Sequence, residues 1–152
     1  MVTLFDPSIR GPVEARVHGL RPDSVRQWGR MTPHQAICHM SDAFRMALNE
    51  RPVAAVPTVF RPAIRFIALW VPMRWPGGRI KTIPEVEQGV GGTPPGDFER
   101  DRADLLELMS RFCAAGPDGR CPTHPIFGPM STAAWGRWAY LHTDHHLRQF
   151  GL

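Results

Sequence analysis

The sequence predicts an all-α protein, a helical bundle with one long crossover connection. Apolar residues recur at three- and four-residue steps in several segments, which is typical of amphipathic helices. No segment shows the period-two alternation of a half-buried strand. With 152 residues, 43% of them apolar, the chain suits one core, so we expect residues 1–152 to form a single domain.

The first predicted helix spans residues 6–20. Asp6 is a favoured N-cap, and Pro7 fits the first helical turn, where its missing N–H is not needed. The pair Gly11-Pro12 interrupts the pattern, so the regular part of this helix could also begin only there.

The second predicted helix begins at Thr32 and runs to about Asn49. Thr32 is suited to the N-cap, Pro33 to the first helical position, and Gln35 completes a capping box three residues after the cap. The apolar residues of this helix form one stripe, which we expect to face the core. They are Ile37, Met40, Phe44 and Leu48.

Residues 51–96 are expected to be mostly irregular, because eight prolines interrupt every longer pattern. Only Pro62 to Val71 is interpreted as a short extra helix, with Pro62 in its first turn. The sequence therefore predicts a long crossover, rich in proline and glycine, between the second helix and the next long one.

Polar caps mark the start of the two remaining helices. One begins at Asp97, carries its apolar residues on one side, and ends near Gly116-Pro117. The other begins at Ser131 and is predicted to continue to the end of the chain.

The charge of the chain indicates no particular partner. Lys and Arg number 18 against 14 Asp and Glu, a net charge of +4, but the cations are scattered, so nucleic-acid binding is not expected. Aromatic and arginine side chains mix over residues 60–81. We interpret this segment as a cover whose arginine stems lie on apolar surface, with an anionic substrate or single-stranded nucleic acid as alternatives.

Cysteine usage and hydropathy favour a cytoplasmic location. The three cysteines are an odd number without C-x-x-C spacing, which suits a reducing compartment. The N-terminus lacks the pattern of a secretory signal, and the most apolar window, residues 64–73, is too short to cross a bilayer. We therefore expect a soluble cytoplasmic protein with no membrane partner.

Two histidines of the last helix are candidates for metal ligands. His142 and His146 are four residues apart, so they lie about 40° apart around the helix and can point at a common ion. Thr143 stands where a zincin motif has its catalytic glutamate, which disfavours a peptidase of that type. Asp144 lies on the other side of the helix, and we expect it to face solvent.

The best candidate for a third ligand is His39 in the second helix, where Ala36 and Ala43 leave space beside the ring. Three neutral imidazoles would leave an open coordination position, as catalytic sites require. The spacing alone leaves alternatives open. Two helical histidines can be four apart by chance or interact with the helix dipole, and His39 alone could be an ordinary buried histidine.

A family resemblance adds to this pattern. Residues 28–40 (WGRMTPHQAICHM), 124–128 (HPIFG) and 142–151 (HTDHHLRQFG) resemble the DUF1569 family of the DinB-like superfamily. The resemblance implies a DinB-like four-helix bundle, often a homodimer, with a three-histidine site for a divalent metal such as nickel or zinc. The matching ligands here are His39, His142 and His146. Members of the superfamily include transferases that use a low-molecular-weight thiol as cosubstrate and metal-dependent hydrolases.

Four further residues are weighed for a role at this site. His145 could be a fourth ligand, a general base or an interface residue, and Asp42 could orient the ring of His39 or be a solvated surface residue. His124 precedes the last helix in a segment that either closes one end of the bundle or is simply a packed loop. Cys38 is interpreted as core packing rather than as a nucleophile.

The sequence thus favours a divalent-metal-dependent enzyme acting on a small molecule, either a thiol-dependent transferase or a hydrolase. The alternative is a non-catalytic bundle that binds a small molecule and uses the histidines only as polar groups in its pocket. His34 and His18 are expected at the surface, without a role in either.

Overall fold

The computed structural model describes residues 1–79, 81–116 and 121–152. These residues form five α-helices and one 3-10 turn and contain no strand, which confirms the predicted all-α class. In chain order the elements are α1 (Pro7–Gly19), α2 (Pro33–Ala47), α3 (Arg61–Trp70), the 3-10 turn η1 (Pro84–Val86), α4 (Phe98–Ala115) and α5 (Thr132–Arg148).

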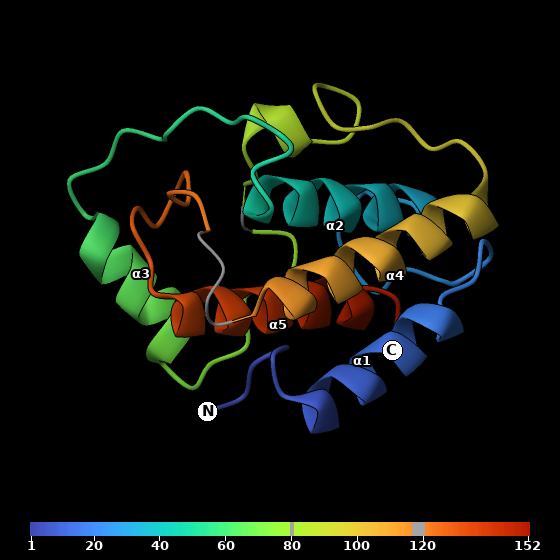
Figure 1. Cartoon of the computed structure of the whole chain (residues 1–152). Helices are drawn as coiled ribbons and strands as arrows, with labels where there is room; N and C mark the ends of the chain where they lie inside the picture. Colours follow the sequence, from blue (N-terminus) through green and yellow to red (C-terminus); the bar gives the residue numbers. More distant parts are fainter. Residues whose placement is uncertain (80, 117–120) are drawn as a thin grey trace.

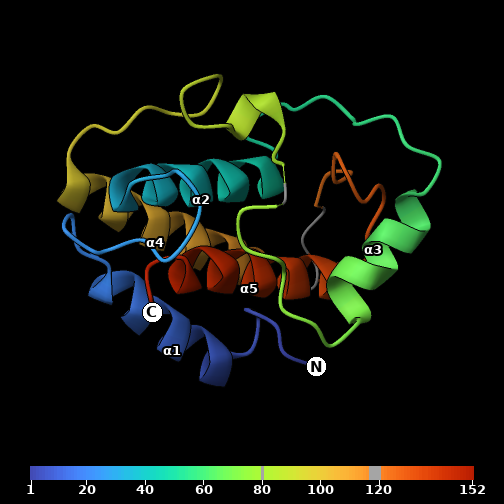
Figure 2. The same cartoon turned by 180° about the vertical axis from the view of Figure 1, so that it is seen from behind.

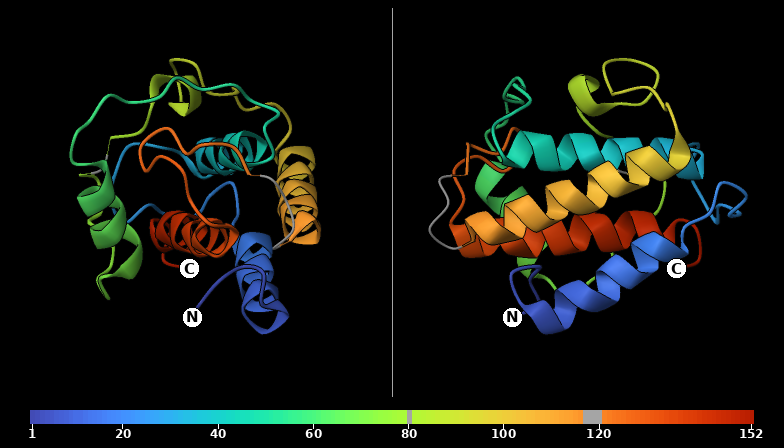
Figure 3. Two further views of the ribbon diagram at one scale, coloured as in Figure 1. Left: turned by 60° about the vertical axis from the view of Figure 1, so that its left-hand side comes forward. Right: turned by 45° about the vertical axis from the view of Figure 1, so that its right-hand side comes forward.

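Helices α2, α4 and α5 lie alongside one another, and α1 packs against α4 and α5 from below (Figure 1 and Figure 3). Helix α3 stands outside this group and contacts α5, while η1 contacts α2. Helices α2 and α5 are neighbours although they are far apart in the sequence, and the space between them is where the histidines meet.

The predicted caps form where the sequence places them. The side chain of Thr32 accepts a hydrogen bond from the Gln35 N–H at 3.2 Å, and the Gln35 side chain accepts one from the Thr32 N–H at 2.9 Å. Asp6, Asp97 and Ser131 likewise accept a backbone N–H from the first turn of their helices. Each cap satisfies a donor that a helix end leaves free.

Some predicted helix boundaries are wrong at their C-terminal ends. Helix α2 stops at Ala47, because Asn49 has a φ of 62°, which a helix cannot continue. Helix α5 ends at Arg148 and not at the chain end, since Gly151 has a φ of 78° and the Leu152 N–H donates back to the Leu147 carbonyl. The predicted end of the fourth helix at Gly116-Pro117 is met at Gly116, whereas Pro117 lies outside the described residues.

The alternative that the regular part of the first helix begins only at Gly11-Pro12 is wrong, because α1 begins at Pro7. Pro12 lies inside the helix without breaking it, and Asp6 caps its start. The short helix predicted at residues 62–71 is α3, displaced by one residue.

The core is centred where α2, α4 and α5 meet. It is made of large apolar side chains with relative exposures of 2% or less, which removes most of their surface from water and holds the three helices together. Among them are Ile37, Met40, Phe44, Leu105, Met109, Phe112, Trp135 and Leu147.

The predicted crossover after α3 is irregular except for η1. Residues 71–79 run from the end of α3 across α5 toward α2 (Figure 2). Parts of this segment cover the space between the two helices that carry the histidines. Within the described ranges, no helix has the length and apolar character needed to cross a membrane.

Candidate metal centre

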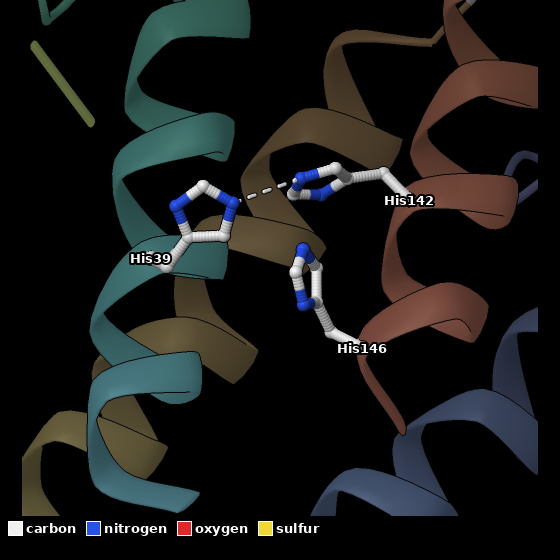
Figure 4. A group of neighbouring side chains, drawn as sticks. All are labelled: His39, His142 and His146. Carbon is white, nitrogen blue, oxygen red and sulfur yellow. Dashed lines mark hydrogen bonds between the residues drawn. The ribbon is translucent and has the colours of Figure 1, made fainter. Parts of the chain in front are cut away.

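Three histidine rings converge in the space between α2 and α5. His39 extends from α2, and His142 and His146 extend from successive turns of α5 (Figure 4). The Nε2 atoms of His39 and His142 are 3.3 Å apart, and one nitrogen of each ring lies within 4.8 Å of the others. Three ring nitrogens at such distances can share one metal ion.

Two of these rings are oriented by hydrogen bonds on their far side. Nδ1 of His39 donates to the carbonyl oxygen of Val86 in η1 at 2.8 Å. Nδ1 of His146 donates to Oε1 of Gln149 at 3.2 Å. Because Nδ1 carries the proton in each ring, Nε2 presents a lone pair toward the common space.

Gln149 is itself held in a fixed orientation. It is 1% exposed, and its Nε2 donates to the carbonyl oxygen of Trp28 at 3.1 Å, so its Oε1 is the atom left for His146. Gly29 permits this contact, because its φ is 77° and a Cβ there would lie 2.7 Å from the Gln149 amide nitrogen. The segment before α2 thereby supports the orientation of His146, a candidate ligand on α5.

Burial keeps the three rings neutral. It lowers the pKa of His39, and it lowers the pKa values of His142 and His146 well below the usual range, with further lowering from the neighbouring histidines. A neutral imidazole is the form that binds a metal ion. The donor set therefore fits a divalent cation that accepts nitrogen ligands.

His142 is positioned by packing against Trp138, which lies one turn earlier on α5. Their ring centroids are 5.1 Å apart with an interplanar angle of 20°, so the rings stack.

The three rings form part of the wall of a cavity of about 1270 Å³. Its lining is largely apolar, with contributions from α2, α3, α5, the crossover and residues 124–127. Three cationic side chains also line it: Arg30, Arg79 and Lys81. The cavity is large enough to hold a small molecule beside the histidines.

The alternatives left open for Asp42 are answered by its contacts. Asp42 is fully buried and is not a surface residue. Its carboxylate accepts hydrogen bonds from the Thr93 N–H at 2.7 Å and the Thr93 hydroxyl at 2.6 Å, and it pairs with Arg51 at 3.0 Å. The ring nitrogen of His39 that Asp42 was expected to orient is instead bonded to Val86. Asp42 thus ties the crossover to α2.

His145 borders the cavity but is not part of the three-histidine group. Its ring packs near those of Trp28 and Trp75, with centroid distances of 4.5 and 5.8 Å. Its Nδ1 is buried without a hydrogen-bond partner among the described residues. Burial, and then the Arg148 guanidinium, lower its pKa to about 4, so it is neutral near pH 7.

The expectation that Asp144 faces solvent is wrong. Its carboxylate is half-buried and pairs with Arg16 and Arg148, at 2.8 Å in each case. It therefore joins α1 to α5.

A second group of side chains with potential metal ligands, not found from the sequence, lies between α2 and α4. His34, expected at the surface, is only partly exposed and its Nε2 bonds to Asp101 at 2.7 Å; Cys38 donates to the same carboxylate at 3.6 Å. The i, i+4 spacing of His34 and Cys38 places both on one face of the helix and could have indicated this group from the sequence.

Burial and the Asp101 charge raise the Cys38 pKa to about 12, which agrees with the expectation of a packed, unreactive thiol.

Fold and site together define a helical protein with a buried three-histidine cluster suited to a metal ion, next to a cavity large enough for a small molecule. The chain belongs to the family described as "Protein of unknown function (DUF1569)", which it matches over residues 15–151. No curated protein and no solved structure matches the chain. Membership of this family accounts for the joint occurrence of the motif-bearing segments. The description of the family names no reaction.

Proposed function

We propose that this protein is a divalent-metal-dependent enzyme in which His39, His142 and His146 hold the ion. The observation that carries the proposal is the convergence of three neutral ring nitrogens within 4.8 Å, two of them oriented by a hydrogen bond on the opposite ring nitrogen. Without an ion, the Nε2 atoms of His39 and His142 can form an N–H···N hydrogen bond, so it is the convergence of the third ring, His146, on the same space that favours a shared ion.

The arrangement of the chain suits a catalytic site better than a structural one. Three ligands leave a coordination position open, and the cavity gives a small molecule access to it. A divalent ion, with nickel and zinc as the proposed candidates, would supply Lewis acidity toward a water molecule in a hydrolase or toward a thiol in a transferase. The apolar wall can contact an apolar part of the substrate, and the cations that line the cavity can receive an anionic part.

The overall architecture that we propose is a DinB-like four-helix bundle of α1, α2, α4 and α5, formed as one domain by residues 1–152. The contacts of α1 with α4 and α5, and of α2 with both, support this arrangement. We further propose a cytoplasmic homodimer that acts on a small-molecule substrate. The three free cysteines are compatible with a reducing compartment. The apolar side chains that α3 exposes, Phe66, Ile67 and Trp70, offer a surface for the second copy.

Metal content is the direct test of the proposed centre. The protein should be purified without a histidine tag or nickel column, and metals quantified in the wild type, in His142→Ala and in His18→Ala. His18 is exposed on α1, so its replacement is the matched control. We expect about one divalent ion per chain in the wild type and the control and a large loss in His142→Ala. Sub-stoichiometric metal in all three proteins would contradict the proposal.

The reaction class requires a second experiment. The metal-loaded protein is incubated with a model electrophile, with and without an added low-molecular-weight thiol. A transferase consumes the electrophile only when the thiol is present, whereas a hydrolase needs only water.

The size and apolar lining of the cavity also support a second function, that of a non-catalytic small-molecule-binding protein. In that case the histidines contribute polarity only, and a chelator leaves the affinity for the small molecule unchanged. A fall in affinity on chelation favours the metal-dependent enzyme.

A further inference from the structure

The group of potential ligands between α2 and α4 lies toward the end of the bundle where both helices begin (Figure 1). It consists of His34, Cys38 and Asp101, each of which offers one ligand atom within 4.8 Å of the other two. His34 and Cys38 are four residues apart on α2 and so share one face of that helix, while Asp101 comes from the first turns of α4. A nitrogen, a sulfur and an oxygen atom therefore converge from two helices.

Both side chains of α2 direct a proton at the same carboxylate oxygen. Nε2 of His34 lies 2.7 Å from Oδ2 of Asp101, and the Cys38 thiol donates to that oxygen at 3.6 Å. The Gly96 N–H also donates to Oδ2, at 2.9 Å, and this contact orients the carboxylate. The two side-chain protons stand where one dication can stand, because a ring nitrogen and a sulfur become metal ligands once their protons have left.

The negative charge of Asp101 is available to a cation. Asp42 on α2 and Asp104 on α4 each pair with an arginine, which neutralises them permanently. Among the residues that the structure describes, Asp101 forms an ion pair only with His34, whose charge can be lost. A dication held by neutral His34, the Cys38 thiolate and the Asp101 carboxylate gives a site with no net charge, which suits a partly buried position.

The spacing of the ligand atoms is close to that in a tetrahedral metal site. Bonds of about 2.0–2.3 Å in such a site separate the ligand atoms by roughly 3.3–3.8 Å. The sulfur and the carboxylate oxygen are already 3.6 Å apart, and the ring nitrogen must move away from that oxygen by only about 1 Å. The side chains of His34 and Asp101 are 21% and 27% exposed, so an ion can reach them and water can take the fourth position.

We propose that His34, Cys38 and Asp101 form a second metal site, for zinc or another dication that binds thiolate, with water as the fourth ligand. No electrons are transferred. The thiol proton of Cys38 goes to solvent, and neutral His34 keeps its one proton on Nδ1, so sulfur, Nε2 and a carboxylate oxygen bond to the ion. The bound ion fixes the start of α4 to α2.

This site is independent of the three-histidine centre and is expected to fill after it. At the three-histidine centre the ring nitrogens already present lone pairs, whereas here a thiol proton and two hydrogen bonds must first be displaced. The thiolate also gives the site its own selectivity: it favours zinc, cadmium and cobalt over magnesium and calcium, which prefer oxygen ligands.

Cobalt(II) is the probe, because a cobalt–thiolate bond gives a charge-transfer band in the near ultraviolet that three imidazoles cannot give. Metal-free, reduced protein is titrated with cobalt(II) as wild type, His142→Ala, Cys38→Ser and Cys121→Ser. Serine at position 38 can still donate to Asp101 but supplies no thiolate. Cys121 is a free, partly buried cysteine elsewhere in the fold, so its replacement is the matched control.

We expect the band in the wild type, in Cys121→Ser and in His142→Ala, and its complete loss in Cys38→Ser. Absence of the band from the wild type overturns the inference, and so does a band that survives in Cys38→Ser. A band that disappears in His142→Ala also overturns it, because the sulfur then belongs to the three-histidine centre. Failure of the three-histidine centre to bind metal contradicts the proposed function but leaves the band in place.

The carboxylate ligand is tested by Asp101→Asn, with Glu99→Gln in the same turn of α4 as the control. Asp101→Asn should weaken cobalt binding at the thiolate site by about 100-fold or more, since even the loss of a partner that orients a ligand costs 10–100-fold. Glu99 is paired with Arg102 and not with the group, so Glu99→Gln should bind as the wild type does. Equal affinities in all three proteins would overturn the inference.

A measurement on the wild type does not depend on how the variants fold. X-ray absorption at the zinc edge, on protein loaded with two zinc ions per chain, should show a sulfur shell at about 2.3 Å beside nitrogen and oxygen at about 2.0 Å. Spectra that contain only nitrogen and oxygen shells would overturn the inference.

Discussion

The Nε2 atoms of His39 and His142 lie 3.3 Å apart although 103 residues separate the two histidines in the sequence. A divalent ion that joins them, together with His146, must bind the folded chain far better than the unfolded one. Metal binding should therefore be visible as stabilisation, and this gives the first prediction.

Zinc should raise the thermal unfolding midpoint of the wild type. At a free concentration 100-fold above the dissociation constant, the gain is about 2.7 kcal/mol. His39→Ala should show no such gain, and His18→Ala should behave as the wild type. Calorimetry at several zinc concentrations checks this, and equal stabilisation of all three proteins would place the metal elsewhere.

Gln149→Met should weaken metal binding about 10–100-fold, because the His146 ring then loses the acceptor that fixes its orientation. Gln149→Glu is the matched variant, since its carboxylate can still accept from Nδ1 of His146. Competition titrations with a chelator measure both affinities. If Met and Glu weaken binding equally, Gln149 does not act through His146.

Asp42→Ala should reduce the free energy of unfolding by about 1–3 kcal/mol, because the Thr93 N–H and hydroxyl lose their buried acceptor and the partly exposed Arg51 loses its anion. It should leave zinc affinity near that of the wild type, since the hydrogen bond that orients His39 is made to Val86 and not to Asp42. The exposed residue Asp23 supplies the control, and Asp23→Ala should change stability little. Denaturant unfolding and zinc titration decide the point, and a folded Asp42→Ala protein without metal affinity would restore Asp42 as a positioning residue.

The metal-free protein should lose stability on acidification. The pKa of His124 is about 3 in the folded protein and about 6.5 when unfolded, so between these values only the unfolded chain takes up the proton. The contribution of His124 is thus full above about pH 6.5 and falls by about 1.4 kcal/mol per pH unit as the pH drops toward 3. His124→Asn should show a shallower pH dependence by about one proton. Identical slopes in the two proteins would contradict the buried neutral state of His124.

Much of the fold could be predicted because its signals are local. The capping box of Thr32 and Gln35 acts within one turn, and the apolar spacing of α2 decides which face is buried whatever it packs against. The C-terminal ends of α2 and α5 were harder to predict, since the left-handed conformations of Asn49 and Gly151 depend on the direction that the chain takes after each helix. The i, i+4 pair on α5 and the inward His39 were visible for the same local reason.

Hydrogen bonds between residues far apart in the sequence could not be predicted from the sequence. Asp42 is bonded to Thr93 rather than to His39, and the orientation of His146 depends on Gln149 and, through it, on Trp28. The unsatisfied donor of His124 becomes apparent only when its loop has closed. The sequence by itself determined the helical class, the helix starts and the three candidate ligands, because capping and periodicity are properties of neighbouring residues. Only the tertiary structure decided which polar atoms are paired and which face the cavity, because that depends on side chains brought together from distant parts of the chain.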